Sequence, residues 1–335
     1  MARKKFLVIG GGTGNHTTLT GLKMLNCDLT AVVTMSDDGG SSGRLRDELG
    51  QLPPGDIRQC LVALADDDGA SAQLRKLFAY RFTAGKGLNG HSFGNLFLSA
   101  LTDITGNAAE AIIEASRMLR IKGRVLPVTL TRSVLKARLS NGTVLVGEST
   151  IDQRGANPDV PIDYIYLEPK SYAYPPVLEA IATADAIIIG PGDIYTSILP
   201  NLLVEDVANA IKASTATKVY VCNLMTKPGE SDGFKASTFL RLVCEYLGTI
   251  DPLDCLLVNS AILPEKLRNR YSSSGQQAVP FDEETCRSMA THIIKAPLLS
   301  AGVYLRHDPD ALARAIIEAV DLTQASPAGA RPGAS

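Results

Sequence analysis

Apolar residues occur along this chain in short runs that end at glycine or at polar residues. Residues 5–10 (KFLVIG) and 29–35 (LTAVVTM) are runs of this kind, and they predict two buried strands. Between them, leucines recur at helical spacing over about residues 17–25. A strand, a helix and a second strand in this order predict a parallel pair joined by a right-handed crossover.

The same alternation of strand and helix patterns returns along the chain. We expect helices over about residues 56–65, with Asp56 as N-cap, and 92–101. Residues 185–203 predict a buried strand, a glycine-proline loop and a helix. Residues 218–226 and 255–260 predict two further strands that each contain an asparagine near their end. The pattern indicates an α/β fold with a mostly parallel sheet.

The middle of the chain has a different pattern. Residues 123–130, 135–140 and 143–149 predict strands, and Asn141-Gly142 joins the last two. Asn-Gly between alternating apolar positions is a strong hairpin signal. We therefore expect an antiparallel hairpin insertion or edge at about residues 123–150. No linker divides the chain, so one domain over residues 1–322 is expected, followed by a Pro/Gly-rich disordered tail at 323–335.

Composition narrows the class of protein. Of the 335 residues, 45% are apolar and 20% charged, and the formal net charge is -2, which is typical of a soluble globular protein. Without a basic stripe, no nucleic-acid partner is expected. The six cysteines have no close pairing, which favours free thiols. The short apolar run after the basic start and the lack of any run near 18 residues predict no signal peptide and no membrane span. We expect a cytoplasmic protein.

A glycine-rich loop follows the first predicted strand. In residues 7–23 (LVIGGGTGNHTTLTGLK), the dinucleotide fingerprint needs a last glycine, but Asn15 or Thr17 stands there. No Gly-Lys-Ser/Thr completes a triphosphate loop either. The alternative is a tight turn that needs glycine only for its geometry. We favour an anion or nucleotide site, with these candidate contacts: Gly11, Gly12, Thr13, Gly14 and Asn15.

A second polar loop follows the next strand, in residues 34–46 (TMSDDGGSSGRLR). The adjacent carboxylates of Asp37 and Asp38 suit a hard divalent cation such as Mg²⁺. Ser41, Ser42, Arg44 and Arg46 could meet phosphate oxygens. The alternative is a solvated turn, which would be preferred if this loop stood alone.

Two further stretches carry candidate ligand contacts. Residues 90–95 (GHSFGN) offer His91 and Asn95, although no Ser–His–Asp arrangement can be argued. Residues 190–201 (GPGDIYTSILPN) repeat the logic of the first loop. The candidates there and at the ends of the later strands are Gly190, Gly192, Thr196, Ser197, Asn223 and Asn259. All these loops are expected at the carboxyl edge of the sheet, where ligands bind in open α/β folds.

Taken together, these stretches resemble the CofD-like superfamily, and within it the bacterial gluconeogenesis factor branch. The resemblance runs in order over about residues 5–320. It is carried by GGGTG…GLK, TMSDDGGSSGRLR, LPPGDIRQCLVALA, LNGHSFGNLFLSAL, IIGPGDIYTSILPNLLV, VCNLMTKPGES, NSAILPEKLRNRY and RHDP. One departure is TGNHTTL after the glycines, where the family has a leucine-rich entry into the helix.

The resemblance implies a Rossmann-like three-layer α/β/α fold that binds a nucleotide. The namesake enzymes move a phospho-acid (2-phospho-L-lactate) from a guanosine diphosphate carrier to a deazaflavin. An aspartate of their first acidic loop holds Mg²⁺, and this aspartate matches Asp37 or Asp38 here. The gluconeogenesis factor branch resembles a regulatory protein required for cell shape and cell-wall synthesis on gluconeogenic carbon. Its members bind UDP-sugars such as UDP-N-acetylglucosamine, and Tyr271 and Arg306 match their nucleotide contacts.

Three functions are therefore weighed. A UDP-sugar-binding regulator, acting on an enzyme of cell-wall precursor supply, comes first because no base–nucleophile pair stands out. A transferase of the namesake kind is second, and a dehydrogenase is third because the fingerprint fails. A uracil could stack on Tyr271, and Arg306 could pair with phosphate. The alternatives are packing of Tyr271 on a helix and pairing of Arg306 with Asp308. A homodimer is the expected assembly.

Overall fold

A seven-stranded parallel sheet forms the centre of the molecule. The computed structural model describes residues 3–155 and 160–325. The strands lie in the order β10-β9-β8-β7-β1-β2-β3, and every neighbouring pair is parallel. Their bounds are β1 Lys4–Gly10, β2 Cys27–Val33, β3 Arg124–Pro127, β7 Ala186–Ile189, β8 Thr217–Val221, β9 Leu253–Asn259 and β10 Ala290–Ala296. Strands β1 and β7 are buried on both faces, as their unbroken apolar runs predict.

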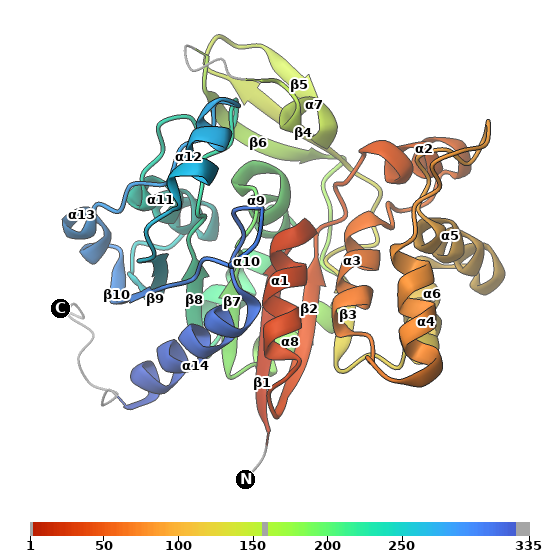
Figure 1. Ribbon diagram of the computed structural model, residues 1–335, viewed down its shortest axis with the longest axis horizontal. Helices are drawn as coiled ribbons and strands as arrows, with labels where there is room; N and C mark the ends of the chain where they lie inside the picture. Colours follow the sequence, from red (N-terminus) through yellow and green to blue (C-terminus); the bar gives the residue numbers. More distant parts are fainter. Residues whose placement is uncertain (1–2, 156–159, 326–335) are drawn as a thin grey trace.

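Helices cover both faces of this sheet, which confirms the α/β class (Figure 1). On one face α1 packs against both α3 and α14, and on the other α10 packs against α8 and α11. The helices are α1 Gly12–Leu22, α2 Gly40–Leu49, α3 Gly55–Leu64, α4 Gly69–Ala79, α5 Phe93–Thr105, α6 Ala108–Leu119, α7 Glu148–Asp152, α8 Pro175–Thr183, α9 Leu199–Leu202, α10 Val207–Ala213, α11 Ala236–Leu247, α12 Glu265–Ser272, α13 Glu283–Arg287 and α14 Pro309–Ala325.

A separate three-stranded antiparallel sheet stands beyond the carboxyl ends of the main strands, at the top of Figure 1. It has the order β5-β4-β6, with bounds β4 Val134–Leu139, β5 Val144–Val146 and β6 Ile162–Glu168. The hairpin of β4 and β5 confirms the Asn-Gly signal. The expected start of the insertion at residue 123 is wrong, because β3 pairs in parallel with β2 at the edge of the main sheet.

Several element boundaries differ from the sequence expectation. Helix α1 begins at Gly12 rather than near residue 17, so the glycine loop forms its first turn. Helix α14 continues to Ala325, three residues into the segment expected to be disordered, and residues 326–335 lie outside the described chain.

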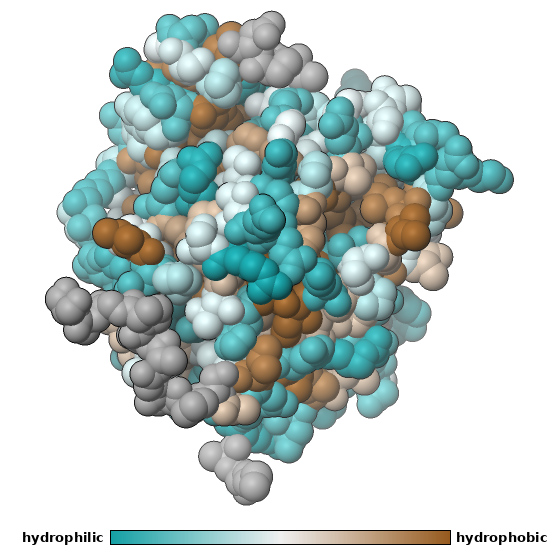
Figure 2. Space-filling model, turned by 90° about the vertical axis from the view of Figure 1, so that its left-hand side faces the viewer, coloured by the Kyte–Doolittle hydropathy of each residue, from teal (hydrophilic) through white to brown (hydrophobic). Residues whose placement is uncertain are grey.

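The surface is mostly polar where Figure 2 shows it, and apolar side chains form separate patches there. All six cysteines are free. Within the described residues, no helix combines the length and hydropathy needed to cross a membrane.

Candidate functional site

Two adjoining hollows lie where the carboxyl ends of β1, β7 and β8 meet. They measure about 280 and 350 Å³, and they share Thr13, Gly14, Gly192 and Asp193. We call the pair the cleft. It joins the first glycine loop to the glycine-proline loop, which follow the paired parallel strands β1 and β7 although some 180 residues separate them in the chain. The predicted convergence at this edge of the sheet is confirmed for these two loops.

The two loops touch through their backbones. A Cβ atom added at Gly14 would lie 1.8 Å from the carbonyl oxygen of Pro191, so no other residue fits there. Gly12 has a φ of +58°, a conformation that L side chains rarely adopt. Glycine is therefore required by the close packing of this loop, and the same loop also lines the cleft. The turn interpretation and the anion-site interpretation of this loop are compatible with each other.

Asp37 and Asp56 face the smaller part of the cleft from the loop after β2 and from the first turn of α3. Each carboxylate packs closely against a glycine. A Cβ atom added to Gly55 would lie 2.0 Å from Asp37 Oδ2, and one added to Gly11 would lie 2.5 Å from Asp56 Oδ2. Burial and, after it, the negative charge of Asp37 raise the pKa of Asp56 to about 7. The pKa of Asp37 is raised in the same way, by burial and by Asp38.

Two more carboxylates complete an acidic wall. Glu148 reaches the same hollow from α7 of the small sheet, and Asp193 from the glycine-proline loop. Burial raises the pKa of Glu148 to about 9, and Asp37 and Asp152 add to the effect. Such mutual repulsion is relieved by a bound cation. Carboxylate oxygens are the ligands that a hard ion such as Mg²⁺ prefers; Asp37 and Asp56 would hold it, and it would neutralise phosphate charge.

Asp38 turns away from the cleft, unlike its neighbour. Its carboxylate accepts hydrogen bonds from the backbone N–H groups of Glu148 (3.1 Å) and Ser149 (2.7 Å), at the start of α7. Arg46 Nη1 lies 3.4 Å from Asp38 Oδ2. Asp38 therefore attaches the small sheet to the second polar loop, and it does not line the cleft.

Four other candidates of the second loop and of residues 90–95 contact one another rather than the cleft. Ser41 Oγ lies 3.0 Å from His91 Nδ1, and Asn95 Nδ2 donates to Ser42 Oγ at 3.3 Å. All four side chains are buried. These bonds dock α2 on the start of α5, so the Ser41–His91 pair is not placed to act on a ligand. Arg44 donates to the carbonyl oxygen of Asn89 at 2.9 Å, also outside the cleft.

The far end of the cleft is formed by α12 and the segment before α14. Tyr271 and Arg306 both line it, as the resemblance implied. The Tyr271 hydroxyl accepts a hydrogen bond from the backbone N–H of Leu305 (3.1 Å), which fixes the ring beside Arg306. The Arg306 guanidinium lies 5.3 Å from the ring centre of Tyr304. The alternative partner, Asp308, instead accepts from Ala311 N–H and caps α14.

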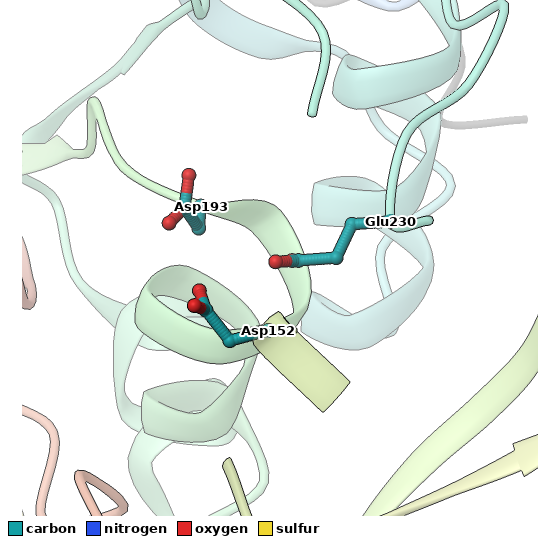
Figure 3. Close-up of side chains that lie close together, drawn as sticks. All are labelled: Asp152, Asp193 and Glu230. Atoms are coloured by element: carbon teal, nitrogen blue, oxygen red, sulfur yellow. The ribbon is translucent and has the colours of Figure 1, made fainter. Parts of the chain in front are cut away.

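Lys227 crosses from the cleft into a group of three carboxylates. Asp152, Asp193 and Glu230 place one oxygen each within 4.8 Å of one another, a geometry that could hold a metal ion (Figure 3). The Lys227 ammonium already pairs with all three. Burial lowers its pKa, but Glu230 and Asp193 outweigh this and leave the pKa above its usual value. The group is therefore an internal ion-pair network.

The structure brings most of the predicted contacts together. The candidates that line the cleft are Gly11, Gly12, Thr13, Gly14, Asp37, Gly192, Thr196, Ser197, Asn223, Tyr271 and Arg306. Those that do not line it are Asn15, Asp38, Ser41, Ser42, Arg44, His91, Asn95, Gly190 and Asn259. The Asn259 side chain instead bonds to the backbone of Ala261 and Leu298. Asn15 is fully buried beneath the first loop because α1 starts early and turns it inward.

Sequence reasoning missed several residues of the cleft, chiefly Asp56, Glu148, Asp193, Lys227 and His307. Four of them lie within motifs that carry the family resemblance, namely PPGDI, GPGDI, MTKPG and RHDP. A charged or imidazole side chain inside such a motif was the sequence feature that could have identified them. Glu148 had no such signal, because the small sheet brings it in from outside the main fold. A larger hollow, about 840 Å³, lies at the opposite edge of the sheet around Lys23 and Lys122 and contains none of the predicted contacts.

Comparison with known proteins agrees with this arrangement. Residues 6–299 match the family described as 2-phospho-L-lactate transferase CofD. A gluconeogenesis factor from Halalkalibacterium halodurans is 41% identical over 330 residues, covering 97% of this chain and 99% of that protein. The gluconeogenesis factor of Bacillus subtilis is 40% identical over 318 residues, covering 94% and 98%.

A crystal structure of a Bacillus halodurans protein superposes with a TM-score of 0.88 at 41% identity, covering 94% of this chain and 100% of that one. The match therefore extends from the motifs around the cleft to the whole fold. The chain belongs to the CofD family, and within it to the gluconeogenesis factors.

Proposed function

We propose that the protein binds a nucleoside diphosphate sugar, UDP-N-acetylglucosamine or a close relative, and acts as a regulator. The observation that carries this proposal is the continuous cleft from the acidic wall, past two touching glycine loops, to Tyr271 and Arg306. Backbone N–H groups at the start of α1 suit a diphosphate, with Mg²⁺ on Asp37 and Asp56 to offset its charge. The uracil would stack on Tyr271, and Arg306 would contact phosphate.

Regulation rather than catalysis is favoured by the side chains in the cleft. Besides carboxylates, hydroxyls and amides, its described lining includes Lys227, Arg306 and His307, and the His307 ring hydrogen-bonds to the Cys222 backbone rather than to a serine. The close serine–histidine pair, Ser41–His91, is buried elsewhere. In the cell, we propose that the sugar nucleotide reports on cell-wall precursor supply to a partner enzyme. Loss of the protein should then alter cell shape on gluconeogenic carbon sources.

A thermal-shift panel tests the proposal, because a ligand that binds only the folded state raises its stability. UDP-N-acetylglucosamine with Mg²⁺ should raise the melting temperature, and EDTA should remove most of that rise. The family match gives a second candidate, a transferase that uses a guanosine diphosphate carrier. Stabilisation by GDP and a deazaflavin, with none by the UDP-sugar, would replace the first proposal by the second.

A further inference from the structure

Two buried hydrogen-bond acceptors, on side chains that line the larger part of the cleft, have no donors. His307 Nε2 and Asn223 Oδ1 are both buried, and neither has a partner among the described residues. Both side chains line the cleft, in the stretch between the glycine-proline loop and Tyr271. An acceptor shielded from water and left without a donor is costly, so a built pair of this kind indicates a ligand that supplies donors.

The other atom of each side chain fixes these two as acceptors. Asn223 Nδ2 donates to the Gly192 carbonyl oxygen at 2.9 Å, so Oδ1 is the atom of this amide that is left without a partner. The His307 ring hydrogen-bonds to the backbone of Cys222, and because Nε2 is unpartnered this bond belongs to Nδ1. Since the Cys222 N–H is already used toward Leu257, Nδ1 must donate to the Cys222 carbonyl. Burial lowers the pKa of His307 to about 4, so Nε2 carries a lone pair at neutral pH.

We propose that His307 Nε2 and Asn223 Oδ1 accept hydrogen bonds from the ribose hydroxyls of the bound nucleotide, and so select ribonucleotides over deoxyribonucleotides. The inference rests on the proposed function, which places the diphosphate at the glycine loops and the base at Tyr271. The sugar joins these two groups and must cross the stretch that His307 and Asn223 line. Phosphate oxygens cannot donate and uracil has one N–H, whereas the ribose offers two neighbouring hydroxyls to two acceptors. The N-acetylglucosamine also has donors, but it is attached on the side of the diphosphate away from the base, so in this placement the ribose is the group next to Tyr271.

Isothermal titration with UDP, 2′-deoxy-UDP and 3′-deoxy-UDP, each with Mg²⁺, tests this inference. The wild-type protein should bind UDP about tenfold more tightly than at least one deoxy analogue, the cost of one buried unmade hydrogen bond. In His307→Phe the affinities for UDP and for that deoxy analogue should become nearly equal. UDP then loses its hydroxyl hydrogen bond to His307, which the deoxy analogue cannot form in either protein. His307→Gln should restore part of the ratio, since its amide oxygen can accept. His292→Phe, on edge strand β10, is the matched control and should keep the wild-type ratio.

Asn223→Ala provides an independent variant at a partly exposed position, should His307→Phe fail to fold. It should also reduce the ratio. Equal binding of UDP and both analogues by the wild-type protein would overturn the inference and leave the proposed function standing. A ratio unchanged in both His307→Phe and Asn223→Ala would also overturn it. If neither UDP nor UDP-N-acetylglucosamine binds, the proposed function fails and this inference fails with it.

Discussion

At the scale of single residues, the cleft holds like charges close together in a partly buried place. Asp37, Asp56 and Glu148 all have raised pKa values, and burial is the largest cause for each. Folding therefore forces these carboxylates into surroundings that favour their protonated form. In a binding protein, a cation that enters with the diphosphate would offset the repulsion between these carboxylates. The ligand-free state would then be less stable, and the ligand would bind more tightly.

Asp56→Asn should show this conflict directly. The pKa of Asp56 is raised to about 7, so between about pH 4 and 7 the native state holds a proton that the unfolded chain releases. Stability of the wild-type protein is lost across this range as the pH rises, because the native state binds more protons. The free energy of unfolding of Asp56→Asn should therefore exceed that of wild type by an amount that grows from pH 4 to 7, to roughly 2–4 kcal/mol.

Urea unfolding of both proteins in EDTA, at several pH values from 4 to 8, measures this difference. Taking the difference between the two proteins removes the contribution of His16 and His307, whose lowered pKa values act in the opposite direction. Asp251→Asn, in an exposed turn, should give no growing difference. An Asp56→Asn effect that is independent of pH would contradict the assignment of this carboxyl.

Gly14→Ala should separate the two glycine loops. Its Cβ would lie 1.8 Å from the Pro191 carbonyl oxygen, a backbone atom that moves only if the loop moves. Forced overpacking of this kind costs about 1–3 kcal/mol or more. Thermal unfolding should show a lower melting temperature, and UDP-sugar affinity should fall with it. Gly87→Ala is the control, since an added Cβ there meets nothing within 4 Å. Equal melting temperatures for both variants would mean that the loops do not depend on this contact.

At the scale of elements, the small antiparallel sheet contributes to the cleft through one short helix. Helix α7 carries Glu148 and Asp152 toward the glycine loops, and Asp38 caps its first turn. Asp37 and Asp38 are adjacent in sequence but have different tasks, because one faces the cleft and the other faces α7. The small sheet is thus attached to the main domain at the point where the acidic wall is completed.

Substitution of the two aspartates should separate these tasks. Asp37→Asn should lower the Mg²⁺ dependence of nucleotide binding with little loss of stability. Asp38→Ala should cost about 1–2 kcal/mol through the lost cap, whereas Asp38→Asn keeps one acceptor and should cost less. Titration of the nucleotide with and without Mg²⁺, together with urea unfolding, gives both quantities. If Asp38→Asn removed the Mg²⁺ dependence and Asp37→Asn did not, their roles would be reversed.

The sequence predicted elements well where one physical signal dominated. Buried strands such as β1 and β7 follow from unbroken apolar runs, and the β4–β5 hairpin follows from Asn141-Gly142. Position across the fold was harder to predict. Edge strand β3 has the same local pattern whether it pairs with β2 or with β4, and only the tertiary fold decides between them. The inward turn of Asn15 and the contact of Ser41 with His91 likewise depend on helix starts that sequence patterns locate poorly.

At the scale of the whole molecule, one lysine connects three segments that are distant in the chain. Lys227 follows β8, and its carboxylate partners come from the small sheet (Asp152), the glycine-proline loop (Asp193) and its own turn (Glu230). Glu230 has a side chain only 1% exposed, so its charge depends on this ammonium for compensation. Burial acts to raise the pKa of Glu230, and the Lys227 ammonium 2.8 Å from its Oε1 opposes that rise and favours the charged carboxylate. The network therefore attaches the small sheet to the main domain through the ion pair of Lys227 with Asp152. Removing the ammonium charge would leave the carboxylates uncompensated.

Lys227→Met should leave a buried carboxylate cluster without a cation. Breaking a buried pair by removing one partner costs about 3–5 kcal/mol, of which the partial exposure of Asp193 should recover some. The double variant Lys227→Met/Glu230→Gln removes the buried charge as well and should regain a large part of that loss. Lys295→Met, which breaks an exposed pair with Glu283, is the control and should cost about 1 kcal/mol or less.

Urea unfolding of the four proteins at pH 7 supplies these free energies, and added Mg²⁺ provides a second readout. With the ammonium gone, Asp152, Asp193 and Glu230 are left at a spacing that suits a metal ion, so Mg²⁺ or Ca²⁺ should stabilise Lys227→Met more than wild type. The double variant should lose this extra response because it lacks one carboxylate. Equal stabilisation of Lys227→Met and wild type by both ions would mean that the cluster relaxes once the lysine is lost, and that Lys227 maintains its geometry as well as its charge balance.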